Sequence, residues 1–218
     1  MGRRRDVLER CRQQLQAQTP DANVHICAGD TGRASDIQAA LKQAWWLNNR
    51  LDIVVPTASG DGARPPLVHD EARFRTELEL HVVGAFTAIR LASPLMARQG
   101  GGSIVCIASN AARTDLKRLS ADCTARACLD GLVRAAAEAL SSASVRVNAV
   151  RPGSVQADTV AAVRYLAGPE SAWVTGQSLA VDGVQALRQT FESGGAVRHR
   201  YGEAVRPELD NTQLISSL

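Results

Sequence analysis

The sequence predicts an α/β fold in which a parallel sheet of about five strands lies between two layers of helices. Short apolar runs of strand length alternate along the chain with longer segments of helical period. These runs are nearly free of polar residues, as expected of strands that are buried on both faces. With 218 residues, 45% of them apolar and 22% charged, the chain can bury one such core.

The predicted elements follow one another as repeated strand-helix-strand units. Residues 36–47 show the helical period clearly, because Ile37, Leu41 and Ala44 recur on one face. The glycines at 100–102 end a long helix, and Pro152-Gly153 ends a strand. The predicted strands are 24–28, 51–57, 103–108, 145–150 and 178–181, and the predicted helices are 4–15, 36–47, 71–98, 120–142 and a short one through Val163 and Leu166.

The first two predicted strands are expected to be neighbours in the sheet. A strand-helix-strand unit usually connects adjacent parallel strands through a right-handed crossover, and residues 36–47 are long enough to make one. We therefore predict that 24–28 pairs directly with 51–57 and forms the edge of the sheet. The helix at 4–15 then has little to pack against and is expected to be poorly anchored.

One domain is predicted over residues 1–184. From residue 185 onward the alternation of strands and helices stops. The segment 185–218 contains Gly194-Gly195, Pro207 and few large apolar residues, which favours an extended or disordered tail.

Composition excludes several classes of protein. A net charge of +3 with scattered arginines lacks the basic patch of a nucleic-acid binder. No run of eighteen apolar residues or secretory signal is present, so we expect a cytoplasmic protein without a membrane span. The five cysteines form no C-x-x-C pair, and we expect neither disulfides nor a metal site.

Two stretches carry most of the functional information, residues 102–109 (GSIVCIAS) and 121–133 (ADCTARACLDGLV). Together with 147–153 (VNAVRPG) and 175–183 (TGQSLAVDG), they resemble the short-chain dehydrogenase/reductase family over residues 2–184. The resemblance implies a Rossmann-like three-layer domain that lacks the family's first two strands. It also implies that the helix-covered lid over the substrate is missing, because 154–174 is short.

The resemblance implies a degraded site for a dinucleotide. In the family, a T-G-x-x-x-G-x-G turn holds the pyrophosphate at a helix N-terminus, and this sequence has no counterpart of it. We therefore expect no cofactor to bind, with NADP or NAD as the cofactor if the chain is incomplete. The vestigial positions aligned with the family's cofactor contacts are Arg3, Arg4, Asp30, Ala58, Pro152 and Gly153.

The catalytic positions of the family are also changed. Its tyrosine, lysine, serine and asparagine align with Asp122, Arg126, Ser109 and His81, so the serine alone is retained. Aspartate and arginine side chains in water titrate far from neutral pH, which suits neither to exchange protons there. Four positions apart on a helix, Asp122 and Arg126 are instead predicted to form an ion pair on its surface.

Three functions stay open. The first is a degenerate family member, not an active enzyme, that forms a homo-oligomer, or a hetero-oligomer with an active relative, through helices 71–98 and 120–142. The alternative is an NAD(P)-dependent oxidoreductase whose sequence is incomplete. The third is a cofactor-free lyase, isomerase or hydrolase that uses His81, Ser109 and Asp122. Family geometry does not aim these three side chains at one another, which counts against the third.

Overall fold

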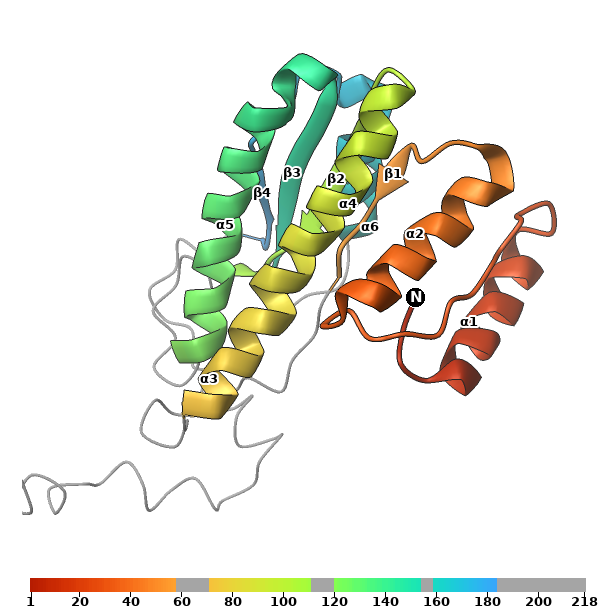
Figure 1. Ribbon diagram of the computed structural model, residues 1–218, viewed down its shortest axis with the longest axis horizontal. Helices are drawn as coiled ribbons and strands as arrows, with labels where there is room; N and C mark the ends of the chain where they lie inside the picture. Colours follow the sequence, from red (N-terminus) through yellow and green to blue (C-terminus); the bar gives the residue numbers. More distant parts are fainter. Residues whose placement is uncertain (58–70, 111–119, 154–158, 184–218) are drawn as a thin grey trace, which may run out of the picture.

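The computed structural model describes residues 1–57, 71–110, 120–153 and 159–183. They form an α/β fold around a parallel sheet with the strand order β1-β2-β3-β4, as Figure 1 shows. The strands are β1 Ile53–Val54, β2 Gly102–Ile107, β3 Val145–Pro152 and β4 Ser178–Val181. The predicted parallel α/β fold is therefore confirmed, with four strands in the described residues in place of about five.

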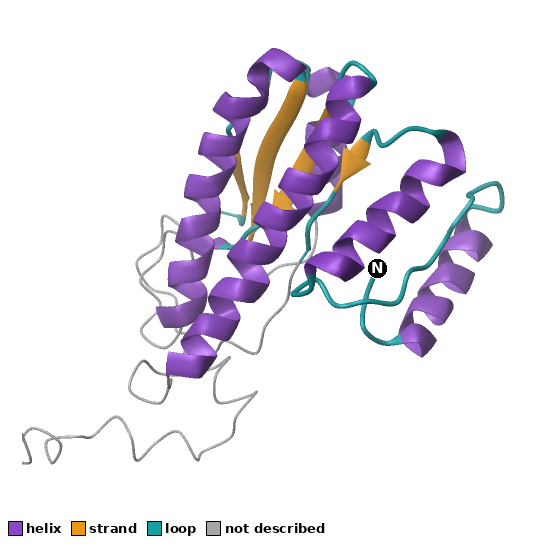
Figure 2. Cartoon of the chain, in the orientation of Figure 1, coloured by secondary structure: helices purple, strands orange, loops and turns teal. Residues whose placement is uncertain are grey.

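The two faces of the sheet are covered by different helices, which makes three layers (Figure 2). Ile104, Cys106 and Val147 point to the face that packs against α2, α4 and α5, whereas Val105 and Val150 point to the face that α6 covers. This alternation follows from the two-residue period of a strand. The helices are α1 Arg5–Gln18, α2 Ala34–Asn48, α3 Glu71–Leu78, α4 Gly84–Arg98, α5 Ser120–Leu140 and α6 Thr159–Ala167.

The centre of the domain is the pair β2 and β3 with α5 packed on it. Ile104 on β2 pairs with Val147 on β3, and neither side chain is exposed to solvent. On α5, every fourth residue is buried against the sheet: Ala121, Ala125, Leu129, Val133 and Ala137. A stripe at this spacing is what an amphipathic helix on a sheet requires.

The predicted strand at 24–28 is absent, and its predicted pairing with 51–57 is wrong. In the described residues, the bridge from this segment is an isolated parallel one between Ala28 and Gly2. The Gly2 N–H donates to the Cys27 carbonyl (3.2 Å), and the Gly29 N–H donates to the Gly2 carbonyl (3.0 Å). Gly2, and not the strand at 53–54, is therefore the partner of this segment. Strand β1 has two residues and forms the edge of the sheet.

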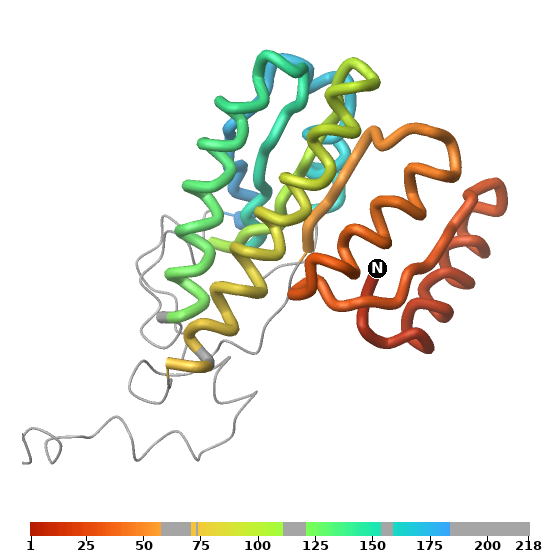
Figure 3. The backbone as a smooth tube through the Cα atoms, viewed as in Figure 1, coloured from red at the N-terminus to blue at the C-terminus, as the bar shows by residue number. Residues whose placement is uncertain are grey.

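The N-terminal region lies past β1, at the side of the sheet (Figure 3). Helix α2 packs on α4 through Ile37 and Leu41, which are buried. Helix α1 has no buried residue at all, in agreement with the expectation that it is poorly anchored.

The predicted helix at 71–98 is present but interrupted. A π-helical turn, Glu79–Val83, separates α3 from α4. By length and composition alone, the stretch Phe74–Arg98 could cross a membrane, but half of that window is buried inside the fold, as in the core helix of an α/β domain. The predicted tail at 185–218 and the aligned cofactor position Ala58 lie outside the described residues.

Candidate functional site

Four ionisable side chains meet where α3 and the π-turn pack against the first turns of α5. They are Glu77, His81, Asp122 and Arg126. The His81 Nε2 atom lies 3.3 Å from Glu77 Oε2 and 3.6 Å from Asp122 Oδ1. Asp122 Oδ1 also accepts a hydrogen bond of 3.1 Å from Arg126 Nε. Two carboxylates, one imidazole and one guanidinium thus share a single cluster.

The cluster is buried. His81 is 2% exposed and Glu77 is 7% exposed. Burial lowers the pKa of His81 to about 4, because an imidazolium loses its hydration there; the nearby charge of Arg126 lowers this pKa further, and Asp122 opposes both. His81 is therefore a neutral imidazole at pH 7. Its Nε2 makes no hydrogen bond within the part of the chain that the structure describes.

The π-turn determines how His81 meets Glu77. The two residues are four positions apart, and the wider turn begins between them at Glu79. Such turns are rare and occur frequently at functional sites. Gly84 follows the π-turn and begins α4, and a Cβ atom at this position would lie 2.8 Å from the Thr31 carbonyl oxygen. A glycine is therefore needed for the helix to approach the loop before α2 so closely.

Arg126 ties the cluster to the end of β2. Its Nη1 donates to the carbonyl oxygens of Ile107 (3.3 Å) and Ala108 (3.0 Å). Ser109 follows directly and is half-buried. The predicted ion pair between Asp122 and Arg126 is confirmed, although the side chains are 17% and 12% exposed and not on the open surface. The pair therefore braces the end of β2 as well as the helix.

A pocket of about 380 Å³ adjoins His81. Its wall includes Met1, Val54 and Val55 of the β1 region, Leu41 and Leu129. Among the described residues, the lining is mostly apolar and includes no lysine or arginine. This lining favours an apolar group over an anionic one.

Comparison with known proteins identifies the family. The model of the short chain dehydrogenase family matches residues 1–165, three quarters of the sequence. The chain belongs to this family. The 7α-hydroxysteroid dehydrogenase of Escherichia coli K12 is 28% identical over 188 residues, which cover 72% of each protein.

Solved structures of the short-chain dehydrogenase family share the fold. A short-chain type dehydrogenase/reductase from Mycobacterium ulcerans superimposes with a TM-score of 0.82 at 27% identity, over 94% of this chain and 86% of the other. A 7α-hydroxysteroid dehydrogenase complexed with NADH and 7-oxo glycochenodeoxycholic acid gives a TM-score of 0.74 at 26% identity, over 82% of this chain and 80% of the other.

The residues aligned with the family's cofactor contacts are spread over three places. Arg3 and Arg4 are exposed before α1. Asp30 uses its Oδ1 to accept the Gly32 N–H (2.9 Å) within its own turn. Pro152 and Gly153 lie at the end of β3, where the Gly153 N–H donates to the Val181 carbonyl (3.0 Å). Their roles toward a cofactor stay a prediction.

The N-terminus of α2 does not fit the pyrophosphate of NAD or NADP. A pyrophosphate needs backbone N–H donors at an open helix N-terminus. At the N-terminus of α2, Asp36 Oδ2 already accepts the Asp30 N–H (2.9 Å). That hydrogen bond lowers the pKa of Asp36, which is therefore a carboxylate and repels a phosphate. We accordingly derive no step of the reaction through a dinucleotide.

Sequence reasoning separated residues that the structure brings together. The expectation that His81 and Asp122 are not aimed at one another is wrong, because they lie 3.6 Å apart. Glu77 was missed altogether, although its spacing of four residues from His81 on a helix predicts a shared face. No local pattern in the sequence indicates that α3 packs against α5.

Proposed function

We propose that this chain is an oxidoreductase of the short-chain dehydrogenase family that oxidises a secondary hydroxyl group to a carbonyl group. The buried cluster around Asp122 carries the proposal, because it stands where the family has its tyrosine and adjoins the pocket through His81. Support for the substrate class comes from the similar hydroxysteroid dehydrogenase and from the apolar lining of the pocket. We infer a hydroxyl on an apolar skeleton.

The charge of the cluster favours oxidation over reduction. A carboxylate can accept the proton of a substrate hydroxyl, but it holds no proton to give to a carbonyl oxygen. Asp122 is the proposed proton acceptor, and Arg126 holds it in place with a bond of 3.1 Å. In this family NAD or NADP accepts the hydride. Either cofactor would have to bind this chain through residues other than the N-terminus of α2, which does not fit a pyrophosphate.

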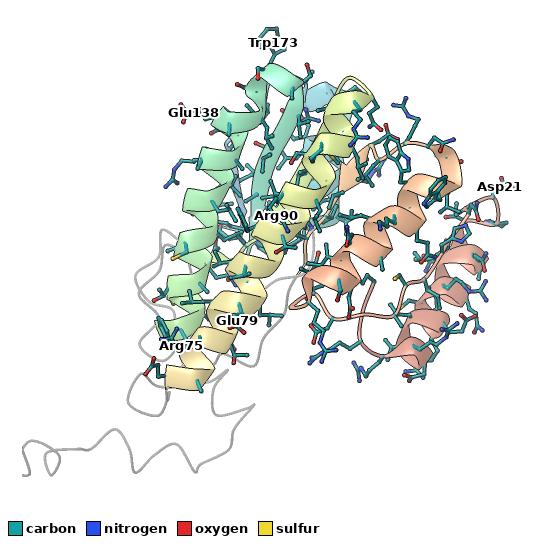
Figure 4. All side chains as sticks on the ribbon, in the orientation of Figure 1. Asp21, Arg75, Glu79, Arg90, Glu138 and Trp173 are labelled. Atoms are coloured by element: carbon teal, nitrogen blue, oxygen red, sulfur yellow. The ribbon has the colours of Figure 1, made fainter. Side chains whose placement is uncertain are left out.

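An assay of secondary alcohols tests this function. The chain is given millimolar NAD⁺ or NADP⁺ and a panel of hydroxysteroids, and reduced nicotinamide is followed by absorbance. We expect slow oxidation that Asp122→Asn lowers by roughly 100-fold or more, the range for loss of a general base. Asp21→Asn, in the exposed turn labelled in Figure 4, is the matched control and keeps the parent rate. Equal rates for the two variants would contradict the proposed role of Asp122.

Binding of the cofactor is measured separately. Calorimetric titration with NAD⁺ and NADP⁺ at low salt is expected to show a free energy weaker than about −4 kcal/mol, which corresponds to a millimolar constant. A micromolar constant for either cofactor would show that the misfit at the N-terminus of α2 is overcome.

A non-catalytic role in an assembly is the second candidate. The π-turn and α4 expose large apolar side chains on their outer side, with Val83 at 49% and Phe86 at 48% exposure. Glu79 and Arg90 lie on the same side, turned away from the sheet (Figure 4). Exposed large apolar side chains of this kind favour an interface between copies, or with a related subunit, through 71–98 and 120–142 in a cytoplasmic protein.

Light scattering after gel filtration tests the assembly. Phe86→Asp is expected to shift an oligomer toward the monomer, because a buried charge destabilises an interface. Val160→Asp, which changes a 70% exposed side chain on α6, is the control and leaves the mass unchanged. A monomeric parent protein would remove this candidate.

A further inference from the structure

The cluster around His81 has the donor atoms of a metal site. Glu77, His81 and Asp122 each offer one ligand atom, and these three atoms lie within 4.8 Å of one another. A nitrogen together with carboxylate oxygens suits zinc and neighbouring transition metals, whereas magnesium and calcium favour oxygen alone.

The separations between donor atoms agree with one bound ion. Zinc binds histidine nitrogen and carboxylate oxygen at about 2.0–2.2 Å, so tetrahedral angles place two donor atoms roughly 3.4 Å apart. His81 Nε2 lies 3.3 Å from Glu77 Oε2 and 3.6 Å from Asp122 Oδ1. The two carboxylate ligand atoms lie within 4.8 Å of each other, so a side-chain rotation has to bring them closer to complete the site.

A second, independent observation is the state of His81. Its side chain is buried, and Nε2 points at the two carboxylates without a hydrogen bond to any described residue. A buried polar atom without a partner is costly, and a cation between the imidazole and the carboxylates removes that cost.

The charges that face the cluster also permit a cation. Two carboxylate side chains, those of Glu77 and Asp122, face the cluster together with one guanidinium group, that of Arg126. Arg126 donates to Asp122 Oδ1 and to the end of β2, so it orients one ligand from outside. Such outer hydrogen bonds are the usual support of ligating side chains.

We propose that Glu77, His81 and Asp122 bind one divalent transition-metal ion, of which zinc is the best fit. Three protein ligands leave a fourth position for water or a substrate atom, and one of the three ligands, His81, also borders the pocket. A metal there could hold a substrate oxygen and make its hydroxyl more acidic. Metal binding does not depend on the proposed oxidation, and its test uses neither substrate nor dinucleotide.

The test is a titration of the full chain, stripped with a chelator, with Zn²⁺ by calorimetry and with Co²⁺ by absorbance. We expect one equivalent of either ion and a visible Co²⁺ spectrum of a site with nitrogen and oxygen ligands. His81→Ala and Glu77→Gln are each expected to weaken metal binding by roughly 100-fold or more, because losing a ligand costs more than losing a residue that only supports a ligand. Circular dichroism confirms that each variant is folded.

Two matched controls separate this site from chance binding. His25→Ala and Glu79→Gln remove an exposed histidine and an exposed glutamate, the latter two residues from Glu77, and are expected to keep the parent affinity. Replacing the exposed Cys11 and Cys128 by serine excludes binding through thiolates. The proposal is overturned if no ion binds, if a thiolate band appears in the Co²⁺ spectrum, or if folded His81→Ala binds as tightly as the parent.

If a variant is unfolded, the parent still decides the question. Saturating Zn²⁺ raises the melting temperature of the parent protein when it binds the native state, and the double cysteine variant must show the same shift. Oxidation activity that is unchanged in chelator, alongside confirmed Zn²⁺ binding, would leave the metal site standing and assign the proton step to the carboxylate alone.

Discussion

The core of β2, β3 and α5 and the N-terminal region of α1 and α2 belong to one family match, yet they are held in very different ways. Ala125, Val133 and Val147 in the first region have no exposed surface. In the second, α1 buries no residue and α2 buries two. A helix is stabilised by a sheet to pack on more than by its own propensity. The region without paired strands is therefore the weaker one.

Hydrogen exchange should show the largest difference between the two regions. The free energy of opening ranges from near zero in weakly packed segments to the full unfolding free energy in a core, which is about 5–15 kcal/mol. We expect amides of α1 to exchange at the low end and those of α5 near the high end. Equal protection of the two helices in exchange measured by mass spectrometry would contradict the comparison.

Two leucine-to-alanine substitutions, one in each region, measure how differently the two regions contribute to stability. Leu129→Ala on α5 removes a side chain that is 2% exposed and should cost about 2–5 kcal/mol of unfolding free energy. Leu15→Ala on α1 removes one that is 51% exposed and should change that free energy by about 0.5 kcal/mol or less. Urea unfolding of both variants measures the difference, and a comparable loss from Leu15→Ala would show that α1 is anchored after all.

The pH dependence of stability probes the buried histidine. The pKa of His81 is about 4 in the folded state, against 6.5 for an ordinary histidine, so the unfolded chain binds more protons between these values. Its contribution is present above pH 6.5 and is lost as the pH falls toward 4, by about 3 kcal/mol. His81→Gln should flatten this part of the curve in denaturant titrations, whereas His25→Gln in the N-terminal region should not.

Two arginines in similar pairs give the smallest effect. Arg126 is 12% exposed and donates to Asp122 and to two carbonyl oxygens, so Arg126→Ala should cost about 1–3 kcal/mol. Arg10 pairs with Asp6 at 3.2 Å on α1, with both side chains about two-thirds exposed, and Arg10→Ala should have no measurable effect. Thermal unfolding of the two variants measures this difference. Equal shifts in melting temperature would contradict the role of Arg126 in stabilising the end of β2.

Local pattern determined the elements of the core. The predicted strand 178–181 coincides with β4 Ser178–Val181, and 103–108 and 145–150 differ from β2 and β3 by one or two residues at their ends. The helix at 120–142 appears as α5 Ser120–Leu140 with a short 3₁₀ turn after it. Apolar runs bounded by glycine and proline specify such elements because burial on both faces leaves few alternatives.

Tertiary structure decided the edge of the sheet and the candidate site. Residues 24–28 have the apolar pattern of a strand, but a strand also needs a partner, and here the partner of Ala28 is Gly2 instead of β1. Glu77, His81 and Asp122 meet because a π-turn rotates one helix while another packs against it. Periodicity along the sequence fixes which face of a helix is buried, whereas contacts between distant side chains depend on how whole elements pack, and no local pattern contains that information.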